Sequence, residues 1–309
     1  MTSIRRRALF VPQTHFEKLP TDEQGGVTNF IFRTDNPTEK WIEETSEKIG
    51  DWKNLSRSIY LRWAITINAM CLAKDHYDAL PDERALQTVT LRSVYNKTTY
   101  VPLAIWSGKQ AASHYEKSTE LVAAYGVADV VGSIEEIVFE AFEIYLRHNP
   151  EKFLVGPENK SLRKLFHDRQ ANPIAWRTAL EVRLDIWRKK KIYSGLHAVM
   201  KQYWEETGLL RPSKYKQTDV SDWCATVRMF SELRNLIVHS ASSVSSELSA
   251  YCAIPTAMTF DFKENEDLHV ELHHLQSIEW FLDQYLSALN VSLLERAKGP
   301  IETWVSPKN

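Results

Sequence analysis

The sequence predicts a mainly α fold: a helical bundle with an inserted β-hairpin, preceded by a mixed α/β N-terminal region that ends at about residue 110. Apolar residues recur at steps of three and four along most of the chain after that point, as they do in amphipathic helices. Only 10 Gly and 12 Pro interrupt the 309 residues, which excludes collagen-like and low-complexity chains. Hydrophobic residues make up 43% of the chain and aromatic residues 11%, so there is ample material for a core.

Charge and cysteine content exclude several classes of protein. The 38 basic and 40 acidic residues give a net charge of −2, which argues against bulk electrostatic binding of nucleic acid but allows a local basic patch. Cys71, Cys224 and Cys252 show no Cys-x-x-Cys spacing, so neither a zinc knot nor a disulfide framework is expected. No secretory signal follows Met1, and no apolar run reaches the roughly 20 residues of a membrane span. We expect a cytoplasmic protein without membrane contact.

The N-terminal region, residues 1–110, contains both kinds of element. A run of β-favouring residues at 27–32 predicts one strand. A helix is expected over about 38–74, because Pro37 suits a helix start and apolar residues then recur at helical spacing. Two β-rich arms around a short turn are expected within 88–101. The sequence indicates no function for this region.

The second region, residues 111–309, is expected to form one helical domain. A helix over 116–147 is apolar on more than one side, so several neighbours should pack against it. Shorter helices are expected within 160–207. Asp219 or Ser221 then caps a further helix, which runs up to a serine-rich stretch.

A hairpin and a last helix complete the second region. Residues 258–262 and 268–272 alternate between apolar and polar around a polar turn at 263–267, which is the pattern of a β-hairpin. A final amphipathic helix is expected over about 273–297. The hairpin is therefore predicted as an insertion between two helices of the bundle.

The strongest candidate for a functional site lies at the end of the helix that precedes the serine-rich stretch. Arg234, Asn235 and His239 are polar residues in an otherwise apolar run. A structural interpretation exists for each: Arg234 extends to solvent, Asn235 bonds a neighbouring segment, and His239 interacts with the helix C-terminus, where a cation is favoured. The residue types alone do not choose between this interpretation and a catalytic one.

The pattern Arg234-Asn235-x-x-x-His239 resembles the R-x4-6-H motif of the HEPN superfamily, in the common form with Asn directly after Arg. The setting is similar too, because HEPN domains are small helical bundles in which the motif lies late on a helix between two other long helices. The resemblance covers about residues 116–297 and implies an HEPN-like bundle. The expected hairpin and the long segment before the motif helix make this domain larger than a minimal HEPN domain, and residues 1–110 show no such resemblance.

These residue types suit metal-independent cleavage of RNA, in which a 2′-hydroxyl attacks the adjacent phosphorus. The reaction needs a base for the 2′-hydroxyl, an acid for the leaving 5′-oxygen and a cation for the phosphorane charge. His239 titrates near neutrality and suits either proton transfer. Arg234 is permanently charged and matches phosphate with two donors, while Asn235 orients the histidine or a phosphate oxygen. No metal and no cofactor is expected.

The spacing of the motif bears on the oligomeric state. Arg234 and His239 are five residues apart, roughly 140° around an ideal helix, so their tips do not converge within one chain. In catalytic HEPN proteins two motifs meet across a two-fold interface, and the resemblance therefore implies a homodimer with one composite site. Leu236 and Val238, beside the motif, are expected at that interface.

Two other groups of residues have the composition of a binding site, one for RNA and one for a metal ion. The basic run Arg188, Lys189, Lys190 and Lys191 is a candidate for holding RNA phosphates, with Trp187 nearby for stacking, and the alternative is a solvated helix face. The pair at 273–274 lacks a third ligand at suitable spacing, so we predict no metal site there.

The sequence therefore predicts an endoribonuclease whose partners are RNA, a second copy of the chain, and an antitoxin or regulatory protein. Family association alone suggests a prokaryotic toxin or a phage-defence effector. Two alternatives stay open: a non-catalytic HEPN-like protein that binds RNA, nucleotide or a protein partner, and a helical scaffold in which the motif is coincidental.

Overall fold

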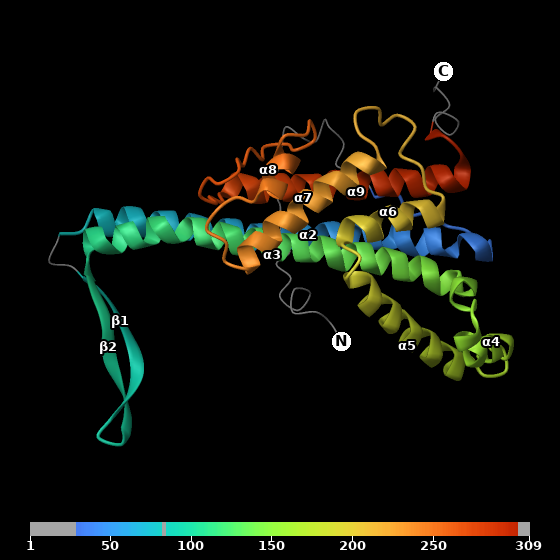
Figure 1. Ribbon diagram of the computed structural model, residues 1–309, viewed down its shortest axis with the longest axis horizontal. Coiled ribbons are helices and arrows are strands. Elements are labelled where there is room, and N and C mark those ends of the chain that lie inside the picture. Colours follow the sequence, from blue (N-terminus) through green and yellow to red (C-terminus); the bar gives the residue numbers. More distant parts are fainter. Residues whose placement is uncertain (1–28, 82–84, 302–309) are drawn as a thin grey trace.

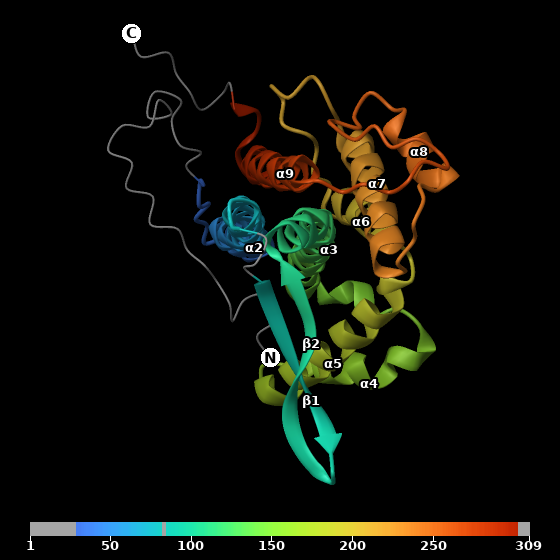
Figure 2. The same cartoon turned by 90° about the vertical axis from the view of Figure 1, so that its left-hand side faces the viewer.

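A computed structural model describes residues 29–81 and 85–301, and within them the fold is mainly helical, as predicted. Two long antiparallel helices, α2 (Lys40–Asp78) and α3 (Gly108–His148), run along the length of the molecule (Figure 1). A third long helix, α9 (Leu272–Lys298), packs against both of them. The end-on view shows these three helices side by side (Figure 2).

Shorter helices cover the other flank of α3. Helix α6 (Leu196–Thr207) packs against α7 (Val220–Val238), and both contact α3. Asp219 caps α7 as predicted, because its carboxylate accepts hydrogen bonds from the backbone N–H groups of Ser221 and Asp222 at 2.8 and 3.1 Å. The remaining helical segments are η2 (Pro37–Glu39), η3 (Pro150–Phe153), η4 (Pro157–Asn159), α4 (Lys160–His167), α5 (Pro173–Ile192) and α8 (Ser246–Cys252).

A β-ribbon joins α2 to α3 at one end of the molecule. Strands β1 (Ala85–Val94) and β2 (Lys97–Ser107) pair antiparallel, which confirms the two β-rich arms and extends both of them. Tyr95 and Asn96 form the turn with φ of 49° and 62°, the left-handed conformation at both positions that a two-residue hairpin turn requires. The ribbon projects from the tip of the two helices, away from the other elements (Figures 1 and 2).

The hairpin predicted at 258–272 is wrong, so the helical bundle has no such insertion. Backbone hydrogen bonds instead join this segment to the serine-rich stretch: Val244 N–H donates to Glu266 O at 2.9 Å, and Leu268 N–H donates to Ser242 O at 3.0 Å. The alternation arises because the buried side chains of Phe260 and Phe262 anchor an irregular loop to the core. A buried anchor at every second residue has the same sequence pattern as a strand.

The strand predicted at 27–32 is also absent from the part of it that the structure describes, since 27 and 28 lie outside the described residues. Side chains of two helices hold the chain there. The Asn290 amide of α9 accepts from Phe30 N–H and donates to Phe30 O, both at 2.9 Å, and Ser46 of α2 accepts from Phe32 N–H at 2.9 Å. These bonds satisfy the backbone groups that a partner strand would otherwise satisfy.

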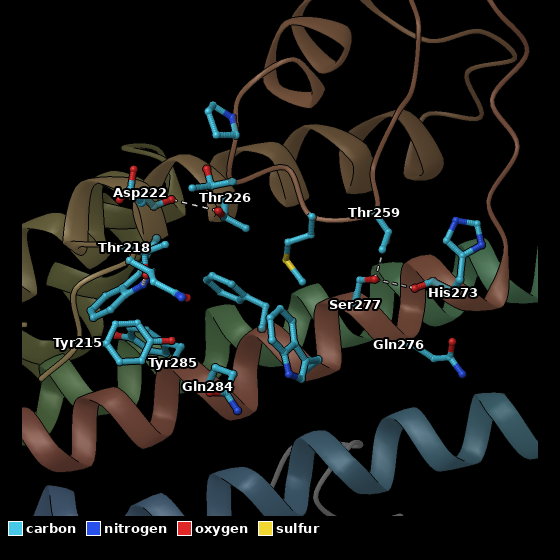
Figure 3. A pocket seen from close by; sticks show the side chains of 17 residues that line it. Tyr215, Thr218, Asp222, Thr226, Thr259, His273, Gln276, Ser277, Gln284 and Tyr285 are labelled. Carbon is cyan, nitrogen blue, oxygen red and sulfur yellow. Dashed lines mark hydrogen bonds between the residues drawn. The ribbon is translucent and has the colours of Figure 1, made fainter. Parts of the chain in front are cut away.

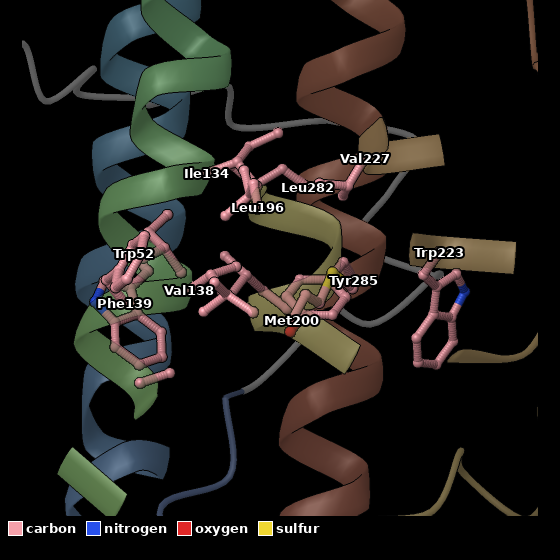
Figure 4. Packing of buried hydrophobic residues seen from close by; sticks show 14 of the residues in the cluster. Trp52, Ile134, Val138, Phe139, Leu196, Met200, Trp223, Val227, Leu282 and Tyr285 are labelled. Atoms are coloured by element: carbon pink, nitrogen blue, oxygen red, sulfur yellow. The ribbon is translucent and has the colours of Figure 1, made fainter. Parts of the chain in front are cut away.

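One hydrophobic core includes residues from both sides of residue 110. Trp52 of α2 and Phe139 of α3 are fully buried between these helices, and Leu282 and Tyr285 of α9 extend the same cluster toward α6 and α7 (Figure 4). The Trp52 indole donates to Glu140 Oε2 at 2.9 Å. The division at residue 110 thus separates two parts of the sequence that share a core.

Close approach of the three long helices depends on Gly126. A Cβ atom there would lie 3.0 Å from Trp63 Cγ of α2 and 3.1 Å from Leu275 Cδ2 of α9. Glycine therefore allows α2, α3 and α9 to meet at this level. None of the described helices combines the length and apolarity needed to cross a bilayer.

Candidate functional site

The motif lies at the C-terminal end of α7, directly before the turn that ends this helix. Ser240 adopts φ of 55°, Ala241 N–H donates to Leu236 O at 2.9 Å, and Ser240 N–H donates to Ile237 O at 3.1 Å. These two bonds form a Schellman motif, which satisfies the last carbonyl groups of the helix. His239 is the C-terminal cap residue and its side chain is exposed.

Within the described residues, the structure joins two of the three motif side chains. Arg234 is half-buried, and its Nη1 donates to Oδ1 of the exposed Asn235 at 3.3 Å. The His239 side chain has no hydrogen bond or ion pair with another described residue, and its backbone N–H donates to Asn235 O at 2.9 Å. The site thus offers a guanidinium held by an amide, and an imidazole one helical turn away that is open to solvent.

This arrangement agrees with the predicted separation of Arg234 and His239 within one chain. No hydrogen bond links Arg234 to His239 among the described residues, as the five-residue spacing predicts. Val238 is 51% exposed, while Leu236 is half-buried and packs against the core. An exposed helix end also suits a histidine that only interacts with the helix C-terminus, so position alone does not decide between the structural and catalytic interpretations.

Side-chain contacts hold the segment after the motif, at residues 245–247, against α7. Ser245, the cap of α8, donates to Glu232 Oε1 at 2.8 Å. One turn earlier, the Arg228 guanidinium pairs with Glu247 of α8 at 3.1 Å. Hydrogen bonds from Tyr251 and Arg228 lower the pKa of the Glu247 carboxyl. The serine-rich stretch therefore lies in a defined position beside the motif.

The basic run at the end of α5 does not act as one patch. Arg188 pairs with Glu143 of α3 at 3.1 Å, and its guanidinium lies 5.0 Å from the centre of the Phe139 ring. Burial raises the pKa of Glu143 although Arg188 opposes the shift. Lys189 and Lys190 are exposed and Lys191 is half-exposed. Arg188 thus anchors α5 on α3 through its ion pair and its ring contact, whereas Lys189 and Lys190 lie at the surface.

Neither histidine of the pair at 273–274 has a metal-binding setting among the described residues, in which no group of three or more His, Cys, Asp or Glu side chains is placed to hold a metal ion. His274 is buried, its ring stacks on Phe262 with centroids 4.8 Å apart, and its Nδ1 accepts from Glu271 N–H at 3.0 Å. Burial is the main cause that lowers its pKa to about 4. His274 is therefore a neutral core residue.

Sequence reasoning missed a groove between α7 and α9, of about 720 Å³ (Figure 3). Buried aromatic rings form its inner wall, and hydroxyl and amide groups line its edges. A sequence signal was available: Gln276, Trp280 and Gln284 recur at four-residue steps and so form a polar-aromatic-polar stripe on one face of the last helix.

Comparisons with protein-family models, with curated proteins and with solved structures found no match. The membership in the HEPN superfamily stays a prediction from the motif.

Proposed function

We propose that this protein is a metal-independent endoribonuclease of the HEPN type, with Arg234 and His239 as catalytic residues and Asn235 as a positioning residue. One observation carries the proposal: the three motif residues occupy the last turns of α7 at the surface, where Asn235 holds the Arg234 guanidinium and the exposed His239 has no described partner. A cation and a titratable group open to solvent are what transesterification of RNA needs.

In the proposed reaction, the 2′-oxygen attacks the adjacent phosphorus, and the bond from phosphorus to the 5′-oxygen breaks. A neutral imidazole removes the 2′-proton, and a protonated imidazole donates a proton to the leaving 5′-oxygen. The Arg234 guanidinium stabilises the negative charge of the phosphorane with two parallel hydrogen bonds. The products carry a 2′,3′-cyclic phosphate and a 5′-hydroxyl.

The proposed active unit is a homodimer, because the motif of one chain holds a single histidine. Two motifs related by a two-fold axis supply one imidazole as base and the other as acid. The 51% exposure of Val238, an apolar side chain next to His239, supports an interface at this helix end. Placement of α3 before α7 and of α9 after it is compatible with an HEPN-like order of helices.

The proposed partners and setting follow from the same family association. They are RNA as substrate, an antitoxin or regulatory protein, and the cytoplasm of a prokaryote in which the protein acts as a toxin or a phage-defence effector. Lys189, Lys190 and Lys191 are proposed to hold RNA phosphates, whereas Arg188 is assigned to packing because of its pairing with Glu143.

The test is incubation of total RNA with the full chain in EDTA, with the ends of the products analysed. We expect cleavage with cyclic phosphate ends, and a loss of about 10²- to 10⁴-fold in rate for His239→Ala, since an acid-base group contributes that much. Arg234→Lys keeps the charge but loses the planar fork, so it is also impaired. His167→Ala is the matched control, because His167 is an equally exposed histidine at the last residue of α4.

The composite site has its own test. Arg234→Ala and His239→Ala homodimers each lack one kind of catalytic side chain. Their mixture is expected to regain partial activity, because the heterodimer contains one intact arginine and one intact histidine, with water replacing the second imidazole at a lower rate. Val238→Asp is expected to weaken dimerisation, because an unpaired carboxylate is desolvated on association. A monomer that cleaves RNA at full rate contradicts the composite site.

Other outcomes select the alternatives. Strict dependence on Mg²⁺ with 5′-phosphate products rules out the mechanism. Binding of RNA with no cleavage by the wild type, and with no effect of His239→Ala, indicates a non-catalytic binding protein. Unfolding of Arg234→Ala with full activity of the remaining folded fraction shows that the motif is structural.

A further inference from the structure

The rim of the groove between α7 and α9 presents an exposed indole with an amide one helical turn to each side. Trp280 is 57% exposed, and it is four residues from both Gln276 and Gln284 on α9. Side chains at this spacing are neighbours on one helix face. A large apolar ring left in water, between groups that donate and accept hydrogen bonds, is typical of a binding surface.

The inner wall offers further aromatic faces. Phe281 and Tyr285 are buried and nearly parallel, with centroids 6.3 Å apart and an interplanar angle of 5°, and the Trp223 ring lies 6.0 Å from Tyr285. Met258 lines the same groove. A planar ring that enters the groove therefore meets aromatic surface on the wall and on the Trp280 rim.

Glutamine amides at the rim of the groove have donors and acceptors that no described residue uses fully. Thr259 and Ser277, which also line the groove, bond each other at 2.6 Å, so these hydroxyls already have partners. The side chains of Gln217 and Gln284 have no hydrogen bond to another described residue. Gln276 has only a long contact, 3.4 Å to the Tyr60 hydroxyl. Each amide is both donor and acceptor, so the rim can match the edge of a heterocycle.

The charge of the lining disfavours an anionic ligand. Among the described residues that line the groove, Asp222 is the one carboxylate, there is no Lys or Arg, and His273 is the one side chain that can carry positive charge. A phosphate group placed here would find no permanent cation and would be repelled by Asp222. The volume of about 720 Å³ is within the usual range of roughly 300–1,000 Å³ for small-molecule sites.

We propose that this groove binds an uncharged nucleobase, which stacks on Trp280 and bonds through its edge to the amides of Gln276 and Gln284. Nucleobases combine a planar π face with a donor and acceptor edge, and glutamine amides pair with such edges. The base comes either from a free nucleoside or from an unpaired nucleotide of an RNA strand. The site is separate from Arg234 and His239 and does not depend on RNA cleavage.

The first test titrates the full chain with adenosine, guanosine, cytidine and uridine, followed by calorimetry. We expect at least one nucleoside to bind, and Trp280→Ala to weaken it about tenfold or more, because stacking of a base on an aromatic side chain is worth that much. Trp280→Phe keeps a ring and retains most of the affinity. Tyr193→Ala is the matched control, since Tyr193 is 92% exposed at the end of α5, outside the groove. Absence of binding, or binding that Trp280→Ala leaves unchanged, overturns the proposal.

The second test concerns charge and source. The 5′-monophosphate of the tightest nucleoside is expected to bind no more tightly than the nucleoside, and tenfold tighter binding overturns an uncharged site. A hexanucleotide of the same base then identifies the source. Tighter, Trp280-dependent binding of the strand assigns the site to unpaired RNA, and weaker binding assigns it to a free nucleoside. These titrations contain no cleavage step, so failure of the ribonuclease proposal leaves their outcome intact.

Discussion

The two ends of the α2–α3 pair have very different surroundings. The body of the molecule comprises residues 40–59 of α2 and 126–148 of α3. There α2 packs against α3 and α9, α3 also contacts α6 and α7, and Trp52 and Phe142 are fully buried. In the arm, which we define as residues 60–81 and 85–125, the two helices pass the N-terminal end of α9 near Tyr60 and Trp63 and then extend beyond it to the β-ribbon (Figure 1). Leu72 is 62% exposed and Tyr125 is 52% exposed. Each of these two helices is thus part of the core along one half and projects from it along the other.

The ribbon extends this contrast. Tyr100, Leu103 and Ile105 of β2 are each at least 60% exposed. An isolated two-stranded hairpin is marginal in water, so the arm is expected to open locally at lower cost than the body. The difference teaches that helix length and apolar content do not report how much of a helix is buried.

The largest expected effect is a difference in stability between two substitutions, one of an aromatic residue in the body and one of an aromatic residue in the arm. Phe142→Ala removes a side chain packed against Trp187 and Tyr203, so the free energy of unfolding should fall by about 3–5 kcal/mol. Tyr125→Ala, in the arm, should cost less than about 1 kcal/mol because half of that side chain is already in water. Chemical denaturation of both variants measures the difference. Equal losses would show that a partner or another copy covers the arm.

The next effect is a pH dependence that originates in the body. The pKa of His274 is about 4 in the folded chain against 6.5 for an ordinary histidine, so above pH 6.5 both states are neutral at this site. As the pH falls toward 4, the unfolded chain binds a proton that the folded chain excludes. Stability should therefore fall by about 2 kcal/mol between pH 7.5 and pH 5 on account of this group. Denaturation of wild type and His274→Phe at both pH values checks this, since the variant should lose that part of the dependence.

A smaller effect is expected where body and arm meet. Gly126→Ala places a methyl group 3.0–3.2 Å from Trp63 and Leu275, on two other helices. Overpacking costs about 1–3 kcal/mol, and the better helix propensity of alanine offsets about 1 kcal/mol of it. We expect a net loss of about 1 kcal/mol in the free energy of unfolding. Lys117→Ala, an exposed position in the arm, should change it by less than about 0.5 kcal/mol, and a gain in stability for Gly126→Ala would show that the helices separate easily.

The smallest effect concerns the turn that presents the motif. Ser240→Gly should raise the free energy of unfolding by about 0.5–1 kcal/mol, because glycine adopts the left-handed φ of 55° without steric cost. Thermal unfolding of the variant beside Ser243→Gly, at a residue outside the positive-φ set, measures this gain. A loss in Ser240→Gly would mean that the serine side chain itself holds the turn.

Much of the local structure is readable from the sequence because it depends on neighbours along the chain. Helical periodicity located α2, α3, α7 and α9. Asp219 was one of the two residues predicted to cap α7, and the structure selects it; such predictions succeed because capping needs only nearby N–H groups. The same local logic failed at 258–272. There, alternation reflected Phe260 and Phe262 anchored in a core formed by distant helices, not a partner strand.

The candidate site divides in the same way. The motif Arg234, Asn235 and His239 is a local pattern on one helix end, so its position and exposure follow from where α7 stops. The neutralisation of Arg188 by Glu143 and the groove between α7 and α9 each join residues far apart in the chain. Their partners are set by helix packing, which no single stretch of sequence records.

By itself, the sequence determined the mainly α class, the approximate ends of the long helices and the presence of the motif, because spacing of apolar residues and capping are properties of contiguous residues. Only the tertiary structure decided which half of α2 is buried, that the single described hairpin lies on the arm, and that α7 and α9 enclose a groove. The burial of α2 and the groove depend on contacts between segments far apart in the chain, such as Lys53 with Asp283 at 3.3 Å. Burial is a property of the assembled core, and a one-dimensional pattern does not contain it.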